Sequence, residues 1–426
     1  MENVGDDQAN WTYALQTCMI VGVVDLDEFI KGAEAWLEEH AQRRGQAVSR
    51  ELRWGEGSDQ VGILHNHTFE EERTLVDGAR AWQQLKSDAG YGSITYPVEY
   101  GGAALAKEYE NAFRQLERQY ATPPIHEAIS ISANIVAPTI LTLGDNEQKR
   151  RFVESLRRTD ELCCQLFSEP GAGSDLGSIA TRAESDGDEW VLNGQKVWTS
   201  GAGHADWGYL IARTNPDPTV PRQRALTAFV IDMRVPGVEV RPLRQMSGGS
   251  SFNEVFFTDA RVSDSLRIGE VGAGWAAAMT TLGIERASGS GGGGGPEPFD
   301  WLVLLARHLG RDVDRIVRQG LANVYIDARV RAWTSNRARV SRTTGGVPGP
   351  EGSIGKLANT NGQQRIAAVA SELLGPRLLA DTGEWGTYAW SEFVLGAPGM
   401  RVAGGTDEIQ RNTISERALG LPREPR

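Results

Sequence analysis

The first third of the chain carries apolar residues at helical spacing. Between residues 26 and 37 they stand three and four positions apart behind the acidic residues Asp25 and Asp27, which favours a helix that begins there. The same spacing predicts helices around residues 75–85 and 109–116, and over residues 127–143. The pattern therefore predicts a helical N-terminal region.

Near residue 162 the pattern changes to short runs separated by turn residues. Residues 190–198 are predicted to form a hairpin with Asn193 and Gly194 at its tip, because Asn-Gly is a preferred two-residue turn. Further strands are expected over residues 208–212, 226–233, 238–243 and 254–258. A β domain in the middle of the chain follows from this spacing.

Helical spacing returns at about residue 274, and a low-complexity run from Ser288 to Gly295 separates the first of these helices from the next. The predicted fold class is α+β. It comprises an N-terminal helical domain (residues 1–161), a middle β-barrel or sandwich domain (162–272) and a C-terminal four-helix-bundle domain (273–426).

Composition narrows the class of protein. The 426 residues are 40% hydrophobic and 23% charged, which is typical of a soluble globular enzyme, and the net charge of −12 argues against nucleic acid or an anionic membrane as partner. Three cysteines, Cys18, Cys163 and Cys164, indicate no disulfide framework, and from the acidic first residues and the lack of a membrane-length apolar run we expect no signal peptide or membrane span. We expect a cytoplasmic protein, and the scattered histidines indicate no metal site.

Two segments carry the strongest chemical signal, residues 166–175 (LFSEPGAGSD) and residues 195–201 (QKVWTSG). Glycines let backbone N–H groups approach a ligand closely, hydroxyls bond ring heteroatoms, and an indole can cover a ring face. The pair predicts a site for a large flat cofactor.

In this order and at this separation, the two segments resemble the flavin-binding segments of the acyl-CoA dehydrogenase family. The resemblance covers nearly the whole chain from about Leu26, including the tail at residues 404–411. It implies FAD as cofactor, oxidation of an acyl-CoA thioester to the 2-enoyl-CoA, and an electron-transferring flavoprotein as acceptor. Within the family the chain is similar to an actinobacterial branch that acts on branched or steroid-derived acyl groups.

The resemblance also implies roles for individual residues. The flavin ring would be lined by Phe167, Ser168, Trp198, Thr199 and Ser200. Ser174 would lie near the CoA portion of the ligand, and Thr406 and Glu408 would contact the adenosine half of FAD.

The catalytic base departs from the common family pattern. Many members carry a glutamate immediately before a Gly-Thr pair in the tail, where this chain has Gly404. A minority carries the base on the helix that opens the C-terminal domain, and Glu285 falls at that place, with Arg286 as a candidate to orient it or to meet the CoA. The alternative is that Glu285 and Arg286 form a solvated surface pair.

The glycine-rich run at residues 288–295 replaces a family motif that reaches the FAD pyrophosphate of a neighbouring subunit. Either the run is a flexible insert in a homotetramer that holds FAD by other contacts, or a homologous partner chain supplies the missing contacts in an α2β2 heterotetramer. A short glycine loop would also leave room for a large or branched acyl group.

Two other functions remain open at this point. One is a flavin-dependent oxygenase or oxidase on the same scaffold. Oxygenases of this kind do not need a carboxylate over the alpha carbon, so the presence of Glu285 counts against them. The other is a non-catalytic subunit of a heteromeric dehydrogenase. The loss of the tail glutamate at Gly404 favours this function, and the presence of a candidate base at Glu285 argues against it. The chain has no Gly-x-Gly-x-x-Gly after a strand and no nucleophile elbow, so a dinucleotide-binding fold and a hydrolase are not supported.

Overall fold

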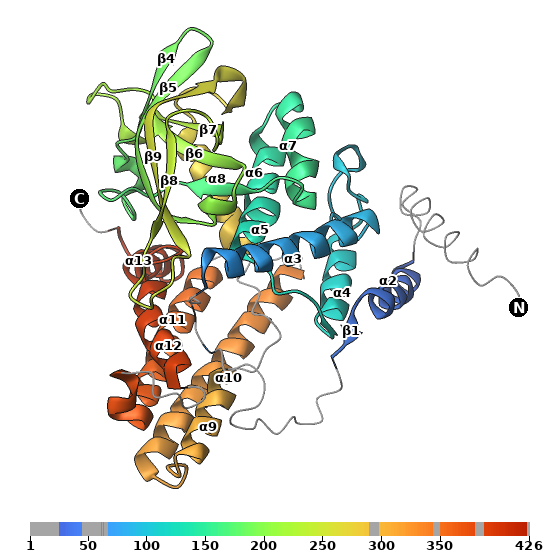
Figure 1. The fold of residues 1–426 in the computed structure, drawn as a ribbon, viewed down its shortest axis with the longest axis vertical. Helices are drawn as coiled ribbons and strands as arrows, with labels where there is room; N and C mark the ends of the chain where they lie inside the picture. Colours follow the sequence, from blue (N-terminus) through green and yellow to red (C-terminus); the bar gives the residue numbers. More distant parts are fainter. Residues whose placement is uncertain are drawn as a thin grey trace, which may run out of the picture. The chain divides into compact units, whose positions relative to one another are not determined.

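The computed structural model describes residues 25–44, 61, 63, 67–288, 298–343, 350–379 and 387–423 (Figure 1). These residues fall into two compact units. The first unit contains the N-terminal helices, the sheet and the helix that follows the sheet. The second contains the remaining C-terminal helices, with Val61 and Ile63 packed in its core.

Helices make up the N-terminal part of the first unit. They are α2 (Leu26–His40), α3 (Phe69–Asp88), α4 (Lys107–Glu117), α5 (Glu127–Ile131), α6 (Ala137–Leu143) and α7 (Asn146–Arg158). Thr68 and Glu71 form a capping box at the start of α3, and Asp145 and Gln148 form another at the start of α7, which satisfies backbone N–H groups that have no partner within the helix. A π-helical turn (Ser132–Val136) joins α5 to α6.

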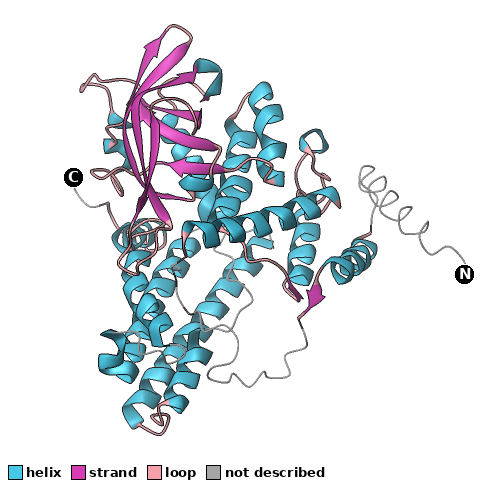
Figure 2. Cartoon of the chain, in the orientation of Figure 1, coloured by secondary structure: helices cyan, strands magenta, loops and turns pink. Residues whose placement is uncertain are grey.

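The middle of the chain forms one mixed eight-stranded sheet (Figure 2). Its strands are β3 (Cys163–Leu166), β4 (Arg182–Asp186), β5 (Glu189–Ser200), β6 (Trp207–Arg213), β7 (Leu226–Asp232), β8 (Val238–Leu243), β9 (Phe252–Ser263) and β10 (Arg267–Ile268). Their order is β10-β7-β6-β4-β5-β9-β8, with β3 parallel to β6.

The predicted hairpin has its turn in a different place. β4 and β5 pair from Asp186 opposite Glu189, so the turn consists of Gly187 and Asp188, and the prediction of a tip at residues 193–194 is wrong. Gly194 instead lies inside β5 at a register shift. A side chain there would stand 2.5 Å from the Thr181 hydroxyl, so the glycine serves a close approach of two backbones.

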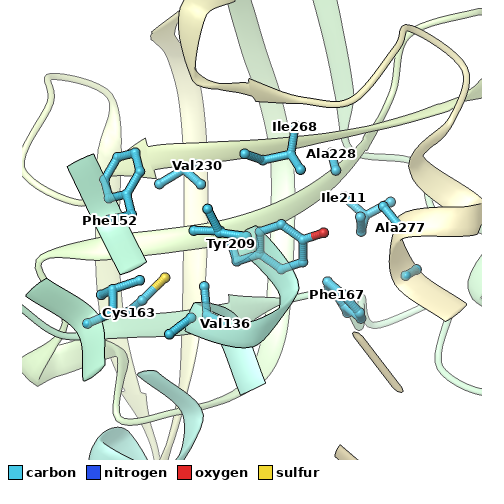
Figure 3. Packing of buried hydrophobic residues seen from close by; sticks show 14 of the residues in the cluster. Val136, Phe152, Cys163, Phe167, Tyr209, Ile211, Ala228, Val230, Ile268 and Ala277 are labelled. Carbon is cyan, nitrogen blue, oxygen red and sulfur yellow. The ribbon is translucent and has the colours of Figure 1, made fainter. Parts of the chain in front are cut away.

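Strands β6 and β7 are buried on both faces of the sheet, because alternate residues of each strand enter different cores. Tyr209 and Ile211 of β6 pack with residues of α6, α7 and α8, as Figure 3 shows for part of that cluster. Leu210 and Ala212 of the same strand enter the core on the other face, with residues of β4, β5, β7 and β9.

Helix α8 (Gly274–Ser288) follows the sheet and belongs to the first unit. The second unit contains α9 (Pro298–His308), α10 (Arg315–Thr343), α11 (Glu351–Leu374), α12 (Thr387–Met400) and α13 (Asp407–Arg417). The predicted α+β class, with helical N- and C-terminal parts and a central sheet, is confirmed.

Of the glycine-rich run, residues 289–295 lie outside the described residues. Among the helices that the structure describes, none is both long and apolar enough to cross a membrane.

Candidate functional site

The two predicted cofactor segments lie against each other in the first unit. The backbone N–H of Val197 donates a hydrogen bond to the carbonyl of Ser168 (2.9 Å), and Lys196 Nζ donates to the carbonyl of Phe167 (3.0 Å). The end of β3 and the end of β5 therefore form one continuous surface.

A buried ion pair fixes this junction. Lys196 Nζ lies 2.8 Å from Glu169 Oε1, and the two side chains are 0% and 6% exposed. The Glu169 carboxylate also accepts hydrogen bonds from the backbone N–H groups of Ala180 and Thr181. Burial lowers the pKa of Lys196 to about 8 against the attraction of Glu169. Burial would raise the pKa of Glu169, but the Lys196 charge and these hydrogen bonds hold it below its ordinary value.

Two neighbouring residues at the end of β5, Trp198 and Thr199, have unusual backbone or hydrogen-bonding properties. Trp198 has a left-handed backbone (φ 60°) at a register shift between Lys196 and Thr199, and its side chain is 59% exposed. Thr199 is 1% exposed, yet its hydroxyl finds no hydrogen-bond partner among the residues that the structure describes. Buried hydroxyls without a partner are rare in native proteins, so this one marks a place where a ligand or water would bind.

The other residues predicted to line a ring are at the edge of the core or half-buried. Phe167 is 5% exposed and lies beside Tyr209, with ring centroids 5.8 Å apart (Figure 3). Ser168 and Ser200 are half-buried, and Ser174 is exposed in the loop that follows. A cavity of about 290 Å³ lies along this loop, lined by residues 169–171, 178, 180, 181, 194 and 195.

Helix α8 places the predicted base on its buried face. Ala278 and Thr281 are fully buried, and Glu285 follows them at the i+7 and i+4 positions, which lie on the same side of a helix. Burial raises the pKa of Glu285, and a hydrogen bond with the Gln165 side chain and the charge of Arg286 oppose that rise. Arg286 itself is exposed.

Gln165 is a site residue that the sequence did not indicate. It lies on β3, paired with Tyr209 and two positions before Phe167. Its hydrogen bond to Glu285 therefore links the predicted base to the strand that leads into the first cofactor segment. Only the position of a polar residue within the apolar run of β3 could have drawn attention to it.

The two tail residues lie in the second unit. Thr406 caps α13, because its hydroxyl accepts from the backbone N–H of Ile409 (3.3 Å), and Glu408 is exposed on the first turn. Between them Asp407 is 1% exposed and is held by three donors, Arg401 Nε, Lys356 Nζ and the Thr360 hydroxyl. The roles predicted for Thr406 and Glu408 stay predictions.

Metal ligands do not gather in the described part of the chain. There, no group of three or more histidine, cysteine, aspartate or glutamate side chains is placed to hold a metal ion. Cys163 and Cys164 are both fully buried thiols whose pKa is raised by burial.

Along the described residues, helices precede a sheet and further helices follow it, and the first helix after the sheet carries a half-buried carboxylate. Family models match along most of the chain, namely the N-terminal domain of the acyl-CoA dehydrogenases at residues 62–160, their middle domain at 164–260 and their C-terminal domain at 272–419. The chain therefore belongs to the acyl-CoA dehydrogenase family.

Individual relatives agree with this assignment. The chain is 35% identical over 410 residues to acyl-CoA dehydrogenase IpdE1 of Mycobacterium tuberculosis, covering 94% of this chain and 99% of that protein. It is 27% identical to a chain in the crystal structure of the ChsE4-ChsE5 complex from Mycobacterium tuberculosis (TM-score 0.68, 84% of this chain and 94% of that one). The Tcur3481-Tcur3483 steroid ACAD shares the fold, at 22% identity (TM-score 0.67, 94% and 98% covered).

Proposed function

We propose that this chain is an FAD-dependent acyl-CoA dehydrogenase that introduces a double bond between the alpha and beta carbons of an acyl-CoA, with Glu285 as the base. The observation that carries the proposal is the position of Glu285 on the buried face of α8, where burial raises its pKa. A carboxylate shielded from water is a stronger base, which suits removal of a weakly acidic proton next to a thioester carbonyl.

The residues at the end of β5 fit the ring of a flavin. The unpartnered hydroxyl of Thr199 supplies a buried hydrogen-bonding group, and the exposed indole of Trp198 supplies a flat apolar surface. Ser168, Ser200 and Phe167 would complete the ring site, and Thr406 and Glu408 would contact the adenosine half. FAD supplies the acceptor for the hydride that leaves the beta carbon.

Residues of this chain would accept the proton from the substrate and orient the base. Glu285 takes the proton from the alpha carbon as that C–H bond breaks, and the electron pair left behind forms the new double bond while the hydride leaves the beta carbon. Gln165, whose side chain lowers the pKa of Glu285, would orient the carboxylate. Arg286 follows Glu285 directly, and with Ser174 it would meet the CoA portion of the substrate.

The substrate and partners form the finer part of the proposal. The solved structure of similar fold that is described as a steroid ACAD supports a large, steroid-derived or branched acyl group. The relative solved as a ChsE4-ChsE5 complex supports assembly with a second, different chain. We propose a heterotetramer with a homologous partner chain, with a homotetramer as the other arrangement. Electrons would pass to an electron-transferring flavoprotein in the cytoplasm. The proposed domain boundaries lie between residues 161 and 162 and between residues 272 and 273.

The proposal is tested on the purified full-length chain, alone and co-expressed with a homologous neighbouring subunit. We expect bound flavin in at least one of these forms, and bleaching of its visible absorption when an acyl-CoA is added without oxygen. In Glu285→Gln the flavin should remain bound while bleaching slows by about 10²–10⁴-fold, the usual contribution of a general base. Glu270→Gln, which removes an exposed carboxylate just before α8, is the matched control.

The outcomes separate the candidate functions. A colourless protein under both conditions contradicts the flavoenzyme proposal. Bleaching of Glu285→Gln at the wild-type rate means that the base lies elsewhere, and unchanged turnover of an assembled complex means that this chain is a non-catalytic subunit. Rapid reoxidation of the bleached flavin by air would instead identify an oxidase or oxygenase.

A further inference from the structure

Three polar side chains from separate elements of the first unit meet beyond the end of β5. Glu72 comes from α3, His126 precedes α5, and His204 ends a short 3-10 turn (Ala202–His204). Glu72 Oε1 lies 3.1 Å from His126 Nε2, and Glu72 Oε2 lies 3.4 Å from His204 Nε2. The side chains of Glu72, His126 and His204 are only 15%, 14% and 7% exposed. We refer to these three residues as the carboxylate clasp.

A backbone hydrogen bond shows which ring nitrogen of His126 carries no proton. The backbone N–H of Ala128 donates to His126 Nδ1 (3.1 Å), and since an N–H can only donate, Nδ1 carries no proton. Nε2 is therefore the ring nitrogen of His126 that donates to Glu72. Burial would raise the pKa of Glu72, but the hydrogen bond of His126 and the nearby His204 lower it to about 2, so the carboxylate is ionised.

The turn after β5 is packed as well as bonded. The ring of Phe69 stacks on His204 with centroids 4.6 Å apart and planes 9° apart. Gly201 has a left-handed backbone (φ 66°), and a side chain there would stand 2.8 Å from Ala128 Cβ, so the turn lies directly on α5. Asn253 Nδ2 donates to the carbonyl of Thr199 (3.1 Å) from the neighbouring strand.

These contacts lie on both sides of Trp198, whose backbone is strained. Trp198 holds a left-handed conformation that a tryptophan adopts rarely, and such conformations persist only where the surrounding structure over-determines them. The Lys196–Glu169 pair holds the chain on one side of Trp198. The carboxylate clasp lies on the other side, where His204 Nε2 stands 3.4 Å from the Glu72 carboxylate and the His204 ring stacks on Phe69.

We propose that Glu72, His126 and His204 are positioning residues for the cofactor site, which hold the end of β5 so that Trp198 and Thr199 meet the flavin ring. This inference rests on the proposed function for the identity of the ligand. The clasp itself touches neither substrate nor reacting atoms in this assignment. It acts by fixing the backbone that carries the two ring-contacting side chains.

The test compares Glu72→Gln with Glu70→Gln in the full-length protein. Both remove one carboxylate from the first turn of α3, but Glu70 is exposed and lies outside the clasp. Hydrogen exchange of the apoprotein is measured over residues 198–204, followed by FAD affinity from quenching of flavin fluorescence and the visible spectrum of the bound flavin. In Glu72→Gln we expect exchange at least about tenfold faster and FAD affinity about tenfold lower, because a charge-assisted contact is lost. Glu70→Gln should match the wild type.

A second variant guards against misfolding. His126→Asn keeps an acceptor for the Ala128 N–H at the start of α5 but removes the contact with Glu72, so it should reproduce the effect of Glu72→Gln. Unchanged exchange in both variants overturns the clasp. Faster exchange with unaltered FAD affinity and spectrum overturns its positioning role. A wild-type protein that takes no FAD refutes the proposed function and the cofactor role of the clasp together, while the exchange data still decide whether the clasp holds the turn.

Discussion

Replacing Lys196 with methionine tests how the two cofactor segments are held together. Methionine keeps most of the length of the side chain and removes its charge, so Glu169 retains only its backbone donors at Ala180 and Thr181. With exposures of 0% and 6%, water has little access to either side chain. Removing one partner of a buried pair costs about 3–5 kcal/mol, and because Glu169 keeps two donors we expect a loss of about 3 kcal/mol.

The loss is measured as the change in the free energy of unfolding of the apoprotein, from urea titrations followed by circular dichroism, with the m-values compared. Lys31→Met, on the exposed side of α2, is the matched control and should lie within about 0.5 kcal/mol of the wild type. The double variant Glu169→Gln with Lys196→Met removes both charges and should recover at least about 1 kcal/mol. A single variant as stable as the control, or a double variant no more stable than the single one, refutes this account of the junction.

Three further outcomes follow from the site. Gln165→Leu removes an interaction that lowers the pKa of Glu285, so that pKa should rise. The ascending limb of the pH profile of kcat/KM should then move to higher pH. An unmoved limb would show that Gln165 does not act on the base. Thr199→Val removes a buried hydroxyl without a partner, so the apoprotein should gain about 1 kcal/mol while FAD affinity falls, and titration with FAD separates the two effects. Cys163 and Cys164 should resist alkylation at pH 8 in the folded protein and react after unfolding, as mass spectrometry of tryptic peptides would show.

The sequence predicted the parts of the fold that depend on local pattern. Period-2 runs and helical stripes predicted the strands and most helices, and the two predicted cofactor segments stand out in the sequence because each is a continuous stretch of chain. The hairpin turn was misplaced because Asn193 and Gly194 are a strong local turn signal, whereas the close approach of Gly194 to Thr181 is set by a strand that the sequence does not position.

The contacts that support the site were beyond sequence reasoning for a similar reason. Lys196 and Glu169 stand inside the two segments, but nothing in either segment shows that their side chains meet in the interior. Gln165 and Glu285 meet only because α8 packs beside the sheet in the first unit. The carboxylate clasp combines three elements, so neither histidine spacing nor a local charge pattern could indicate it.

The backbone of the tail supports the placement of the base on α8. Gly404 stands where many family members carry a glutamate, and here it adopts a left-handed conformation (φ 64°) that is followed by another at Gly405 (φ 86°). Gln410 Nε2 donates to the Gly404 carbonyl (3.1 Å), which stabilises this turn. A glutamate would be strained at such a φ, because its Cβ crowds the backbone where glycine does not. Glu285 meets no such obstacle in α8, where it continues the buried face. Two observations made in separate units thus favour the same assignment. The tail backbone disfavours a glutamate at position 404, and α8 presents a carboxylate, Glu285, whose pKa is raised by burial.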